Sequence, residues 1–179
     1  MNEIIVPLHE SLTQSLTEVA SQVGKFYAML SDVEFVKRAA NAWSPAENLD
    51  HLIKSNKPLA RALTMTQGVL HRVLKTADKP SRTFQEVRAQ YDAMLARGAV
   101  AAGSFLPAEP SSNAREHQQQ LLEQWDKYSQ ELVRAVEAWR DGELDKYLIP
   151  HPLLGDLTVR EMLFFTLYHN MRHISAGGD

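Results

Sequence analysis

Apolar residues recur at intervals of three and four along most of this chain, and this spacing predicts helices rather than strands. A first helix is expected over about residues 8–31, and a second over about residues 45–74. A third long helix is expected over about residues 113–141, where the apolar positions form a heptad-like seam. A fourth begins at Thr158 and is apolar nearly all round, so we expect it to be buried.

Two of these helices begin with the same capping pattern. Ser44 and Glu47 are three residues apart, as in a capping box, and Pro45 between them suits the first helical position. Thr158 and Glu161 repeat the pattern at the start of the last helix. Each pair can satisfy free backbone N–H groups, so both starts are predicted at these residues.

A shorter helix and a long loop separate the second and third long helices. Thr83 and Glu86 form another capping box, and the helix that they open should stop at Gly98. Residues 99–112 read as a loop long enough to cover a pocket, although we favour a simple connector. Pro58 should kink or split the second helix, because proline lacks a backbone donor and clashes with the preceding turn.

Composition bounds the classes of function. The 179 residues are 44% hydrophobic and 23% charged, which is ordinary for one globular domain, and the turn-rich links favour a helical bundle. The net charge of −3 gives no electrostatic signature for nucleic acid. No run approaches the roughly 20 apolar residues of a membrane span, and the N-terminus lacks a secretory pattern, so we expect a cytoplasmic location without a membrane partner.

The chain contains no cysteine. Disulfides, thiolate metal ligands and a cysteine nucleophile are therefore excluded. Any thiol chemistry would need a thiol supplied by a cosubstrate.

Three histidines are the main candidates for chemistry. His169 and His173 are four residues apart on the expected last helix, so their Cβ atoms lie about 5–6 Å apart on one face. Two imidazoles at this spacing can bind one metal ion. His51, in the second turn of the helix that begins at Pro45, could supply a third donor if the two helices pack together. The alternative is that they are ordinary surface or hydrogen-bonded core histidines, since such a pair also occurs by chance.

The histidines lie within longer motifs. Residues 43–51, Trp-Ser-Pro-Ala-Glu-Asn-Leu-Asp-His, resemble the W-[ST]-x-x-E-x-x-x-H element of the DinB-like superfamily. Residues 151–161, followed by His169 and His173, resemble its closing element, h-P-x-x-G-x-L-T-x-x-E. The resemblance implies an all-α four-helix bundle, here with a short additional helix and residues 1–179 as one domain. It also implies a homodimer, a small-molecule substrate, and a divalent metal such as zinc or nickel held by His51, His169 and His173.

Three neutral imidazoles would leave a coordination position open, as in catalytic rather than structural metal sites. The leading hypothesis is an enzyme that activates a low-molecular-weight thiol for transfer to a small electrophilic substrate. The alternatives are a hydrolase that uses metal-bound hydroxide and a non-catalytic metal-binding bundle. Two other metal designs are excluded, because the chain has no Glu-x-x-His pair and because Asn170 replaces the glutamate of H-E-x-x-H.

Other residues could support the histidines. Glu47, one turn before His51, could orient a ligand or accept a proton as a catalytic residue, although the capping box gives it a structural task that we favour. Asn48 and Asp50 are candidates for contacts behind the ligands. His151 could approach the pocket, although a loop histidine is more often solvated. The remaining histidines have polar neighbours and read as surface residues: His9, His71 and His117.

Overall fold

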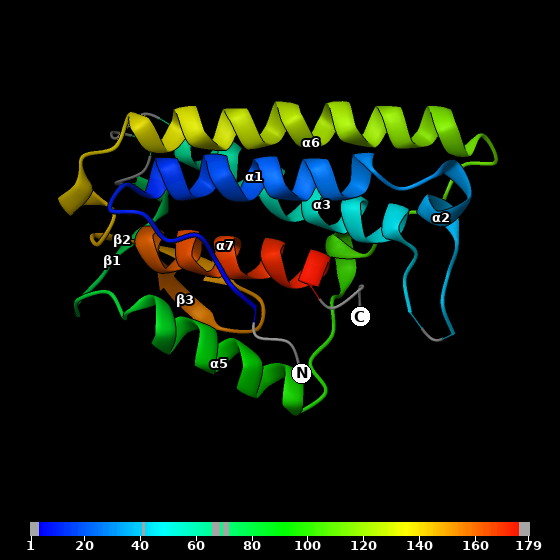
Figure 1. Ribbon diagram of the computed structural model, residues 1–179. Helices are drawn as coiled ribbons and strands as arrows, with labels where there is room; N and C mark the ends of the chain where they lie inside the picture. The colour runs from blue at the N-terminus through cyan, green and yellow to red at the C-terminus, as the bar shows by residue number, and fades with distance from the viewer. Residues whose placement is uncertain (1–3, 41, 66–68, 70–71, 176–179) are drawn as a thin grey trace.

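The computed structural model describes residues 4–40, 42–65, 69 and 72–175. Within these residues the protein is mostly helical, with six α-helices and a small three-stranded sheet (Figure 1). The prediction of an all-α protein is therefore confirmed in its helical character and wrong in omitting the sheet. His71, expected at the surface, lies outside the described residues.

The long helices of the described chain lie side by side (Figure 1). These are α1 (Leu12–Ala28), α3 (Pro45–Leu63), α6 (Ala114–Glu137) and α7 (Val159–Ser175). Helix α6 packs against α1 and α3, and α7 packs against α1 and contacts α3. Helix α5 (Phe84–Ala96) packs against the other side of α7, which therefore lies inside the molecule.

The first helix is shorter than predicted at both ends. Its N-cap is Ser11, whose hydroxyl accepts a hydrogen bond from the backbone N–H of Gln14, so Leu8 precedes the helix. The chain turns after Ala28, and Ser31 then caps a short helix that was not predicted, α2 (Asp32–Val36). The prediction used only the spacing of apolar residues. It therefore began this helix before Ser11 and continued it to Ser31, although the side chains of both residues cap helices.

Helix α3 begins where the sequence predicted it. The Ser44 hydroxyl accepts from the Glu47 N–H, and the Glu47 carboxylate accepts from the Ser44 N–H, which completes the capping box. The helix runs through Pro58 and is not split there. It ends at Leu63, so the predicted extension to residue 74 is interrupted, although part of that stretch lies outside the described residues.

The predicted limits of α5 and α6 are largely confirmed. Thr83 and Glu86 form the expected capping box, and α5 ends just before Gly98, which has a φ of 86°. Such a positive φ suits glycine, which has no Cβ to clash with the carbonyl. Helix α6 begins after its N-cap Asn113, as predicted, and its last residue is Glu137.

The sheet precedes α7 and fixes where that helix begins. Strands β1 (Lys75–Thr76), β2 (Tyr147–His151) and β3 (Gly155–Thr158) are antiparallel in the order β1-β2-β3. The β2–β3 hairpin pairs His151 with Gly155 and ends at Thr158, which caps α7 by a reciprocal pair of hydrogen bonds with Glu161. The capping box at this helix start is therefore confirmed, whereas the preceding link is a hairpin and not a simple loop.

The core is centred on α7. Val159, Leu163 and Leu167 are fully buried, and most of the helix around them is also buried, as its apolar sequence predicted. No helix within the described residues combines the length and apolar character needed to cross a membrane.

Candidate metal centre

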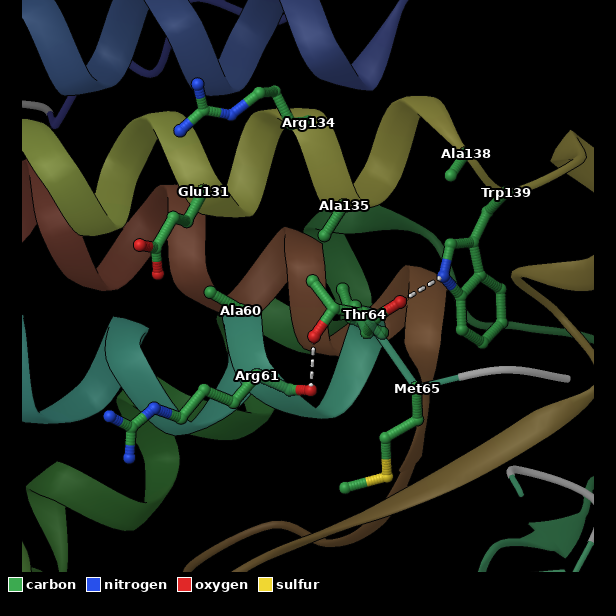
Figure 2. A pocket seen from close by; sticks show the side chains of 10 residues that line it. Ala60, Arg61, Thr64, Met65, Glu131, Arg134, Ala135, Ala138 and Trp139 are labelled. Carbon is green, nitrogen blue, oxygen red and sulfur yellow. Dashed lines mark hydrogen bonds between the residues drawn. The ribbon is translucent and has the colours of Figure 1, made fainter.

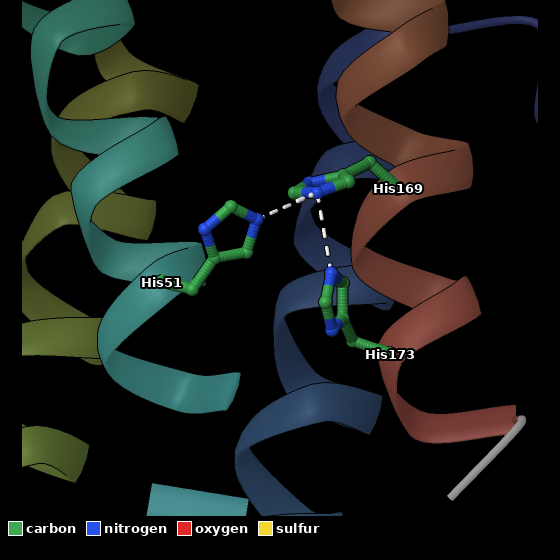
Figure 3. Close-up of side chains that lie close together, drawn as sticks. All are labelled: His51, His169 and His173. Atoms are coloured by element: carbon green, nitrogen blue, oxygen red, sulfur yellow. Dashed lines mark hydrogen bonds between the residues drawn. The ribbon is translucent and has the colours of Figure 1, made fainter. Parts of the chain in front are cut away.

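His51, His169 and His173 point toward one another from α3 and α7 (Figure 3). His169 Nε2 lies 3.1 Å from His51 Nε2 and 3.3 Å from His173 Nε2. Their side chains are buried, with exposed fractions between 4% and 7%. The structure therefore brings together the pair on the last helix and the histidine from the earlier helix, as the sequence predicted.

Oxygen acceptors behind the cluster fix the hydrogen positions on two of the rings. His51 Nδ1 lies 2.7 Å from the carbonyl oxygen of Phe105, and His173 Nδ1 lies 2.7 Å from the amide oxygen of Asn48. Because these oxygens can only accept, each Nδ1 must hold the hydrogen and donate it. In a neutral imidazole, Nε2 then has a free lone pair, and both lone pairs are directed toward His169.

The orientation of Asn48 is itself determined by the start of α3. Its amide nitrogen donates to the carbonyl oxygens of Trp43, at 3.3 Å, and Ser44, at 3.1 Å. The amide oxygen must therefore face His173. Asn48 thus contacts a candidate ligand, His173, from behind, as the sequence suggested.

Burial keeps the three rings neutral. Desolvation lowers the pKa of His51, holds that of His169 well below its usual value and lowers that of His173 to about 3. A hydrogen on His169 Nε2 could be donated to only one of the two Nε2 lone pairs that face it. Hydrogen bonds among the three rings therefore cannot pair both lone pairs. Three neutral imidazoles whose candidate donor nitrogens lie within 4.8 Å of one another are a donor set that fits a divalent metal.

Aromatic rings surround the three histidines. Phe165 stacks on His169 with ring centroids 5.0 Å apart, and the Trp43 ring lies 5.1 Å from that of His51. The Tyr91 ring lies 6.1 Å from that of His169. Such apolar walls limit the access of water and strengthen electrostatic interactions at the cluster.

His151 is not a solvated loop residue, and that prediction is wrong. It lies at the end of β2, with its ring 4.3 Å from that of Phe165. Its Nδ1 accepts hydrogen bonds from the backbone N–H groups of Leu153 and Leu154, and burial lowers its pKa to about 4. The hairpin turn therefore holds His151 behind Phe165, and it is not part of the cluster.

The structure places the Glu47 carboxylate between Arg38 and Ser44. The carboxylate is buried and accepts from the guanidinium of Arg38 and from the N–H and hydroxyl of Ser44. The hydrogen bond from Arg38 lowers the pKa of Glu47 to about 2. These contacts fit the structural role of Glu47 in the capping box of α3. A catalytic role for Glu47 stays a prediction. Sequence reasoning did not identify Arg38 as its partner.

This ion pair predicts a dependence of stability on pH. Because the pKa of Glu47 is lowered from 4.5 to about 2 on folding, its contribution is fully present above about pH 4.5 and is lost as the pH falls toward 2. We expect Glu47→Gln to have a clearly lower free energy of unfolding than the wild type at pH 7. The difference between the two proteins, the stability gap, should be smaller at pH 3. Urea unfolding at both pH values measures this gap.

The control is Glu123→Gln, on the exposed face of α6, which removes one negative charge that is not part of the ion pair. It should give the same stability as the wild type at pH 7. An equal loss in both variants, or a gap for Glu47→Gln that does not change with pH, would contradict the assignment.

The loop of residues 99–112 is more than the simple connector that we favoured. Besides the contact of Phe105 with His51, the Leu106 carbonyl accepts from Lys54 Nζ at 2.9 Å. The N–H of Ala108 donates to Asp50 at 2.7 Å. The loop is thus bound to α3 beside His51. Its length had left a role over a pocket open, but no motif indicated these contacts.

A separate pocket of about 630 Å³ lies between the end of α3 and the end of α6 (Figure 2). Trp139 closes one side of it and donates from Nε1 to the carbonyl of Leu63 at 3.0 Å. Arg61, Glu131 and Arg134 supply the charged groups around it. The described residues that line this pocket do not include the histidine cluster, so the two features are independent.

Fold and site together define a mostly helical protein with a buried three-histidine cluster that is compatible with a metal. The sequence profile of the DinB superfamily matches residues 15–176, and the chain belongs to this superfamily. The resemblance found in the motifs is therefore confirmed.

One relative is a protein of Bacillus subtilis (strain 168) described as "Uncharacterized protein YuaE". It is 26% identical over 139 residues, which are 78% of this chain and 77% of that protein. No solved structure gives a significant match.

Proposed function

We propose that this protein is a metal-dependent enzyme that transfers a low-molecular-weight thiol to a small electrophilic substrate. His51, His169 and His173 would hold a divalent metal, zinc or nickel, through their Nε2 atoms. The observation that supports this most strongly is the convergence of these nitrogens while the Nδ1 atoms of two rings face oxygen acceptors. Histidine ligands of metals in proteins have this arrangement of partners.

A divalent metal held by three neutral ligands supplies Lewis-acid chemistry, and it lowers the pKa of a thiol or water at its open position. The residues of this chain orient the donors and limit water. Phe105 and Asn48 fix the rings of His51 and His173. Phe165 stacks on the His169 ring, and Trp43 lies against that of His51. The net reaction would join the thiol sulfur to an electrophilic carbon, and the thiol proton would leave with the displaced group or enter the product.

We also propose that α1, α3, α6 and α7 form a four-helix bundle, that residues 1–179 are one domain, and that two copies form a homodimer. A cytoplasmic location is part of the same proposal. Size measurement in solution tests the dimer, and limited proteolysis tests the single domain.

The test of function has two steps. Protein purified without an affinity tag should contain about one divalent metal ion per chain by elemental analysis. Turnover should then require a thiol when electrophiles are offered together with glutathione, bacillithiol or mycothiol. Esters and lactones are assayed in parallel, with and without thiol.

Each outcome separates the candidates. Thiol-dependent turnover that is lost on metal removal supports the transferase. Turnover of esters or lactones without any thiol would favour a hydrolase instead. Stoichiometric metal without turnover in any assay would favour the non-catalytic metal-binding protein, and absence of metal would reject both enzymes.

A further inference from the structure

Residues 103–108 cover the part of α3 that contains His51. This segment, which begins with the short helix η1 (Gly103–Phe105), presents three backbone groups in succession to one helix face. The Phe105 carbonyl faces His51, the Leu106 carbonyl accepts from Lys54, and the Ala108 N–H donates to Asp50. One of the three contacts is to the cluster, and the other two are to its immediate neighbours on α3.

Asp50 and Lys54 are linked to each other as well as to the segment. They are four residues apart on α3, with Lys54 Nζ 2.8 Å from Asp50 Oδ2. The same Asp50 oxygen accepts from Ala108 at 2.7 Å. Their side chains are only 17% and 33% exposed, so solvent screens this pair less than it screens a fully exposed one.

The reason for anchoring the segment lies in the His51 ring. Neutral imidazole has its hydrogen on either nitrogen, and only a fixed acceptor at Nδ1 keeps Nε2 free as a donor to a metal. The acceptor here is a backbone carbonyl in a loop, and holding a loop in one conformation costs conformational entropy. Anchors on both sides of the required position offset that cost.

We infer that Asp50 and Lys54 are positioning residues of the metal centre, which bind residues 103–108 so that the Phe105 carbonyl holds His51 in its Nδ1–H form. The effect on metal affinity rests on the function proposed above, whereas the effect on the His51 ring does not. Neither side chain contacts the ligand nitrogens; both act through the loop.

The test uses the full chain and two readouts. Long-range ¹H–¹⁵N NMR spectra of the metal-free protein report which nitrogen of His51 holds the hydrogen. Competition with a chromophoric chelator gives the Kd for Zn²⁺. We expect Nδ1–H in the wild type, a mixture of both forms in Asp50→Ala, and a Kd for Zn²⁺ weakened about 10- to 100-fold in that variant.

Two further variants control the result. Asp50→Asn keeps an oxygen acceptor for Ala108 and should restore the Nδ1–H form. Asp126→Ala removes a carboxylate that binds Gln130 four residues on, along the exposed face of α6, and should change neither readout. Circular dichroism of each variant checks that it folds.

The inference is overturned if metal-free wild-type protein holds the hydrogen on Nε2 of His51. It is also overturned if Asp50→Ala matches Asp126→Ala in both readouts. If the wild type binds no Zn²⁺ while Asp50→Ala still changes the His51 ring, the proposed function fails and the positioning role stands.

Discussion

Changing His169 to alanine is expected to abolish stoichiometric binding of a divalent metal. Its Nε2 is the atom that lies near both other donors, at 3.1 Å from His51 and 3.3 Å from His173, so its loss leaves two nitrogens from different helices. Removing a hydrogen-bond partner behind a metal ligand weakens metal affinity about 10- to 100-fold. Removing a ligand itself should weaken it by more than this. Elemental analysis and the Kd for Zn²⁺ measure the effect.

Thermal unfolding gives a second measurement of the same change. A ligand present at 100 times its Kd stabilises the folded state by about 2.7 kcal/mol, so Zn²⁺ should raise the Tm of the wild type and not that of His169→Ala. His117→Ala, on α6, is the matched control and should respond as the wild type does. An equal response to Zn²⁺ in all three proteins would show that the ion binds elsewhere.

Changing Glu161 to alanine is expected to destabilise the fold by about 3 kcal/mol, because it removes the partner of a largely buried ion pair. The Glu161 carboxylate is 5% exposed and accepts from the backbone N–H and guanidinium of Arg82 and from the Thr158 N–H. Since Arg82 is 34% exposed, water can solvate part of its charge in the variant, which keeps the loss below that of a fully buried pair. Urea unfolding measures it.

Glu86 provides a matched control for this prediction. It occupies the same position of a capping box, three residues after Thr83, but its carboxylate is exposed. Glu86→Ala should therefore cost much less than Glu161→Ala. If the two variants lost equal stability, capping would explain the whole effect and the ion pair with Arg82 would contribute nothing.

Three helix starts could be predicted because their signals are local. Ser44 with Glu47, Thr83 with Glu86 and Thr158 with Glu161 each satisfy backbone groups within one turn, so a stretch of four residues is sufficient to predict the start. Helix ends have weaker signals. The second helix was extended past Leu63 because apolar residues continue at helical spacing.

The sheet could not be predicted, because its pairing is not local. β1 pairs Lys75 with Leu148 across the sheet, and β2 contains Pro150, which argues against a strand when it is read in isolation. The hairpin turn at Gly155, with a φ of 75°, was interpreted as part of a link. Its consequence, the packing of the His151 ring against that of Phe165, was missed for the same reason.

At the candidate centre, the sequence identified the histidines but not what orients two of them. The spacing of His169 and His173 and the motif around His51 were sufficient to expect convergence. The acceptor of His51 is a backbone carbonyl 54 residues away, and no side-chain pattern marks such a group. Asn48 was a candidate without a partner, since only packing decides that it faces His173. Metal binding itself stays a prediction.

The cluster joins positions that are 118 residues apart in the chain, His51 and His169. An ion bound there would close a long loop, and cross-links that span long loops restrict the unfolded chain most strongly. In a protein without cysteine, such an ion would take the place of a disulfide. Removing the ion with a chelator would then destabilise this fold, as reducing a disulfide destabilises a secreted protein. The free energy of unfolding would depend on the concentration of available metal.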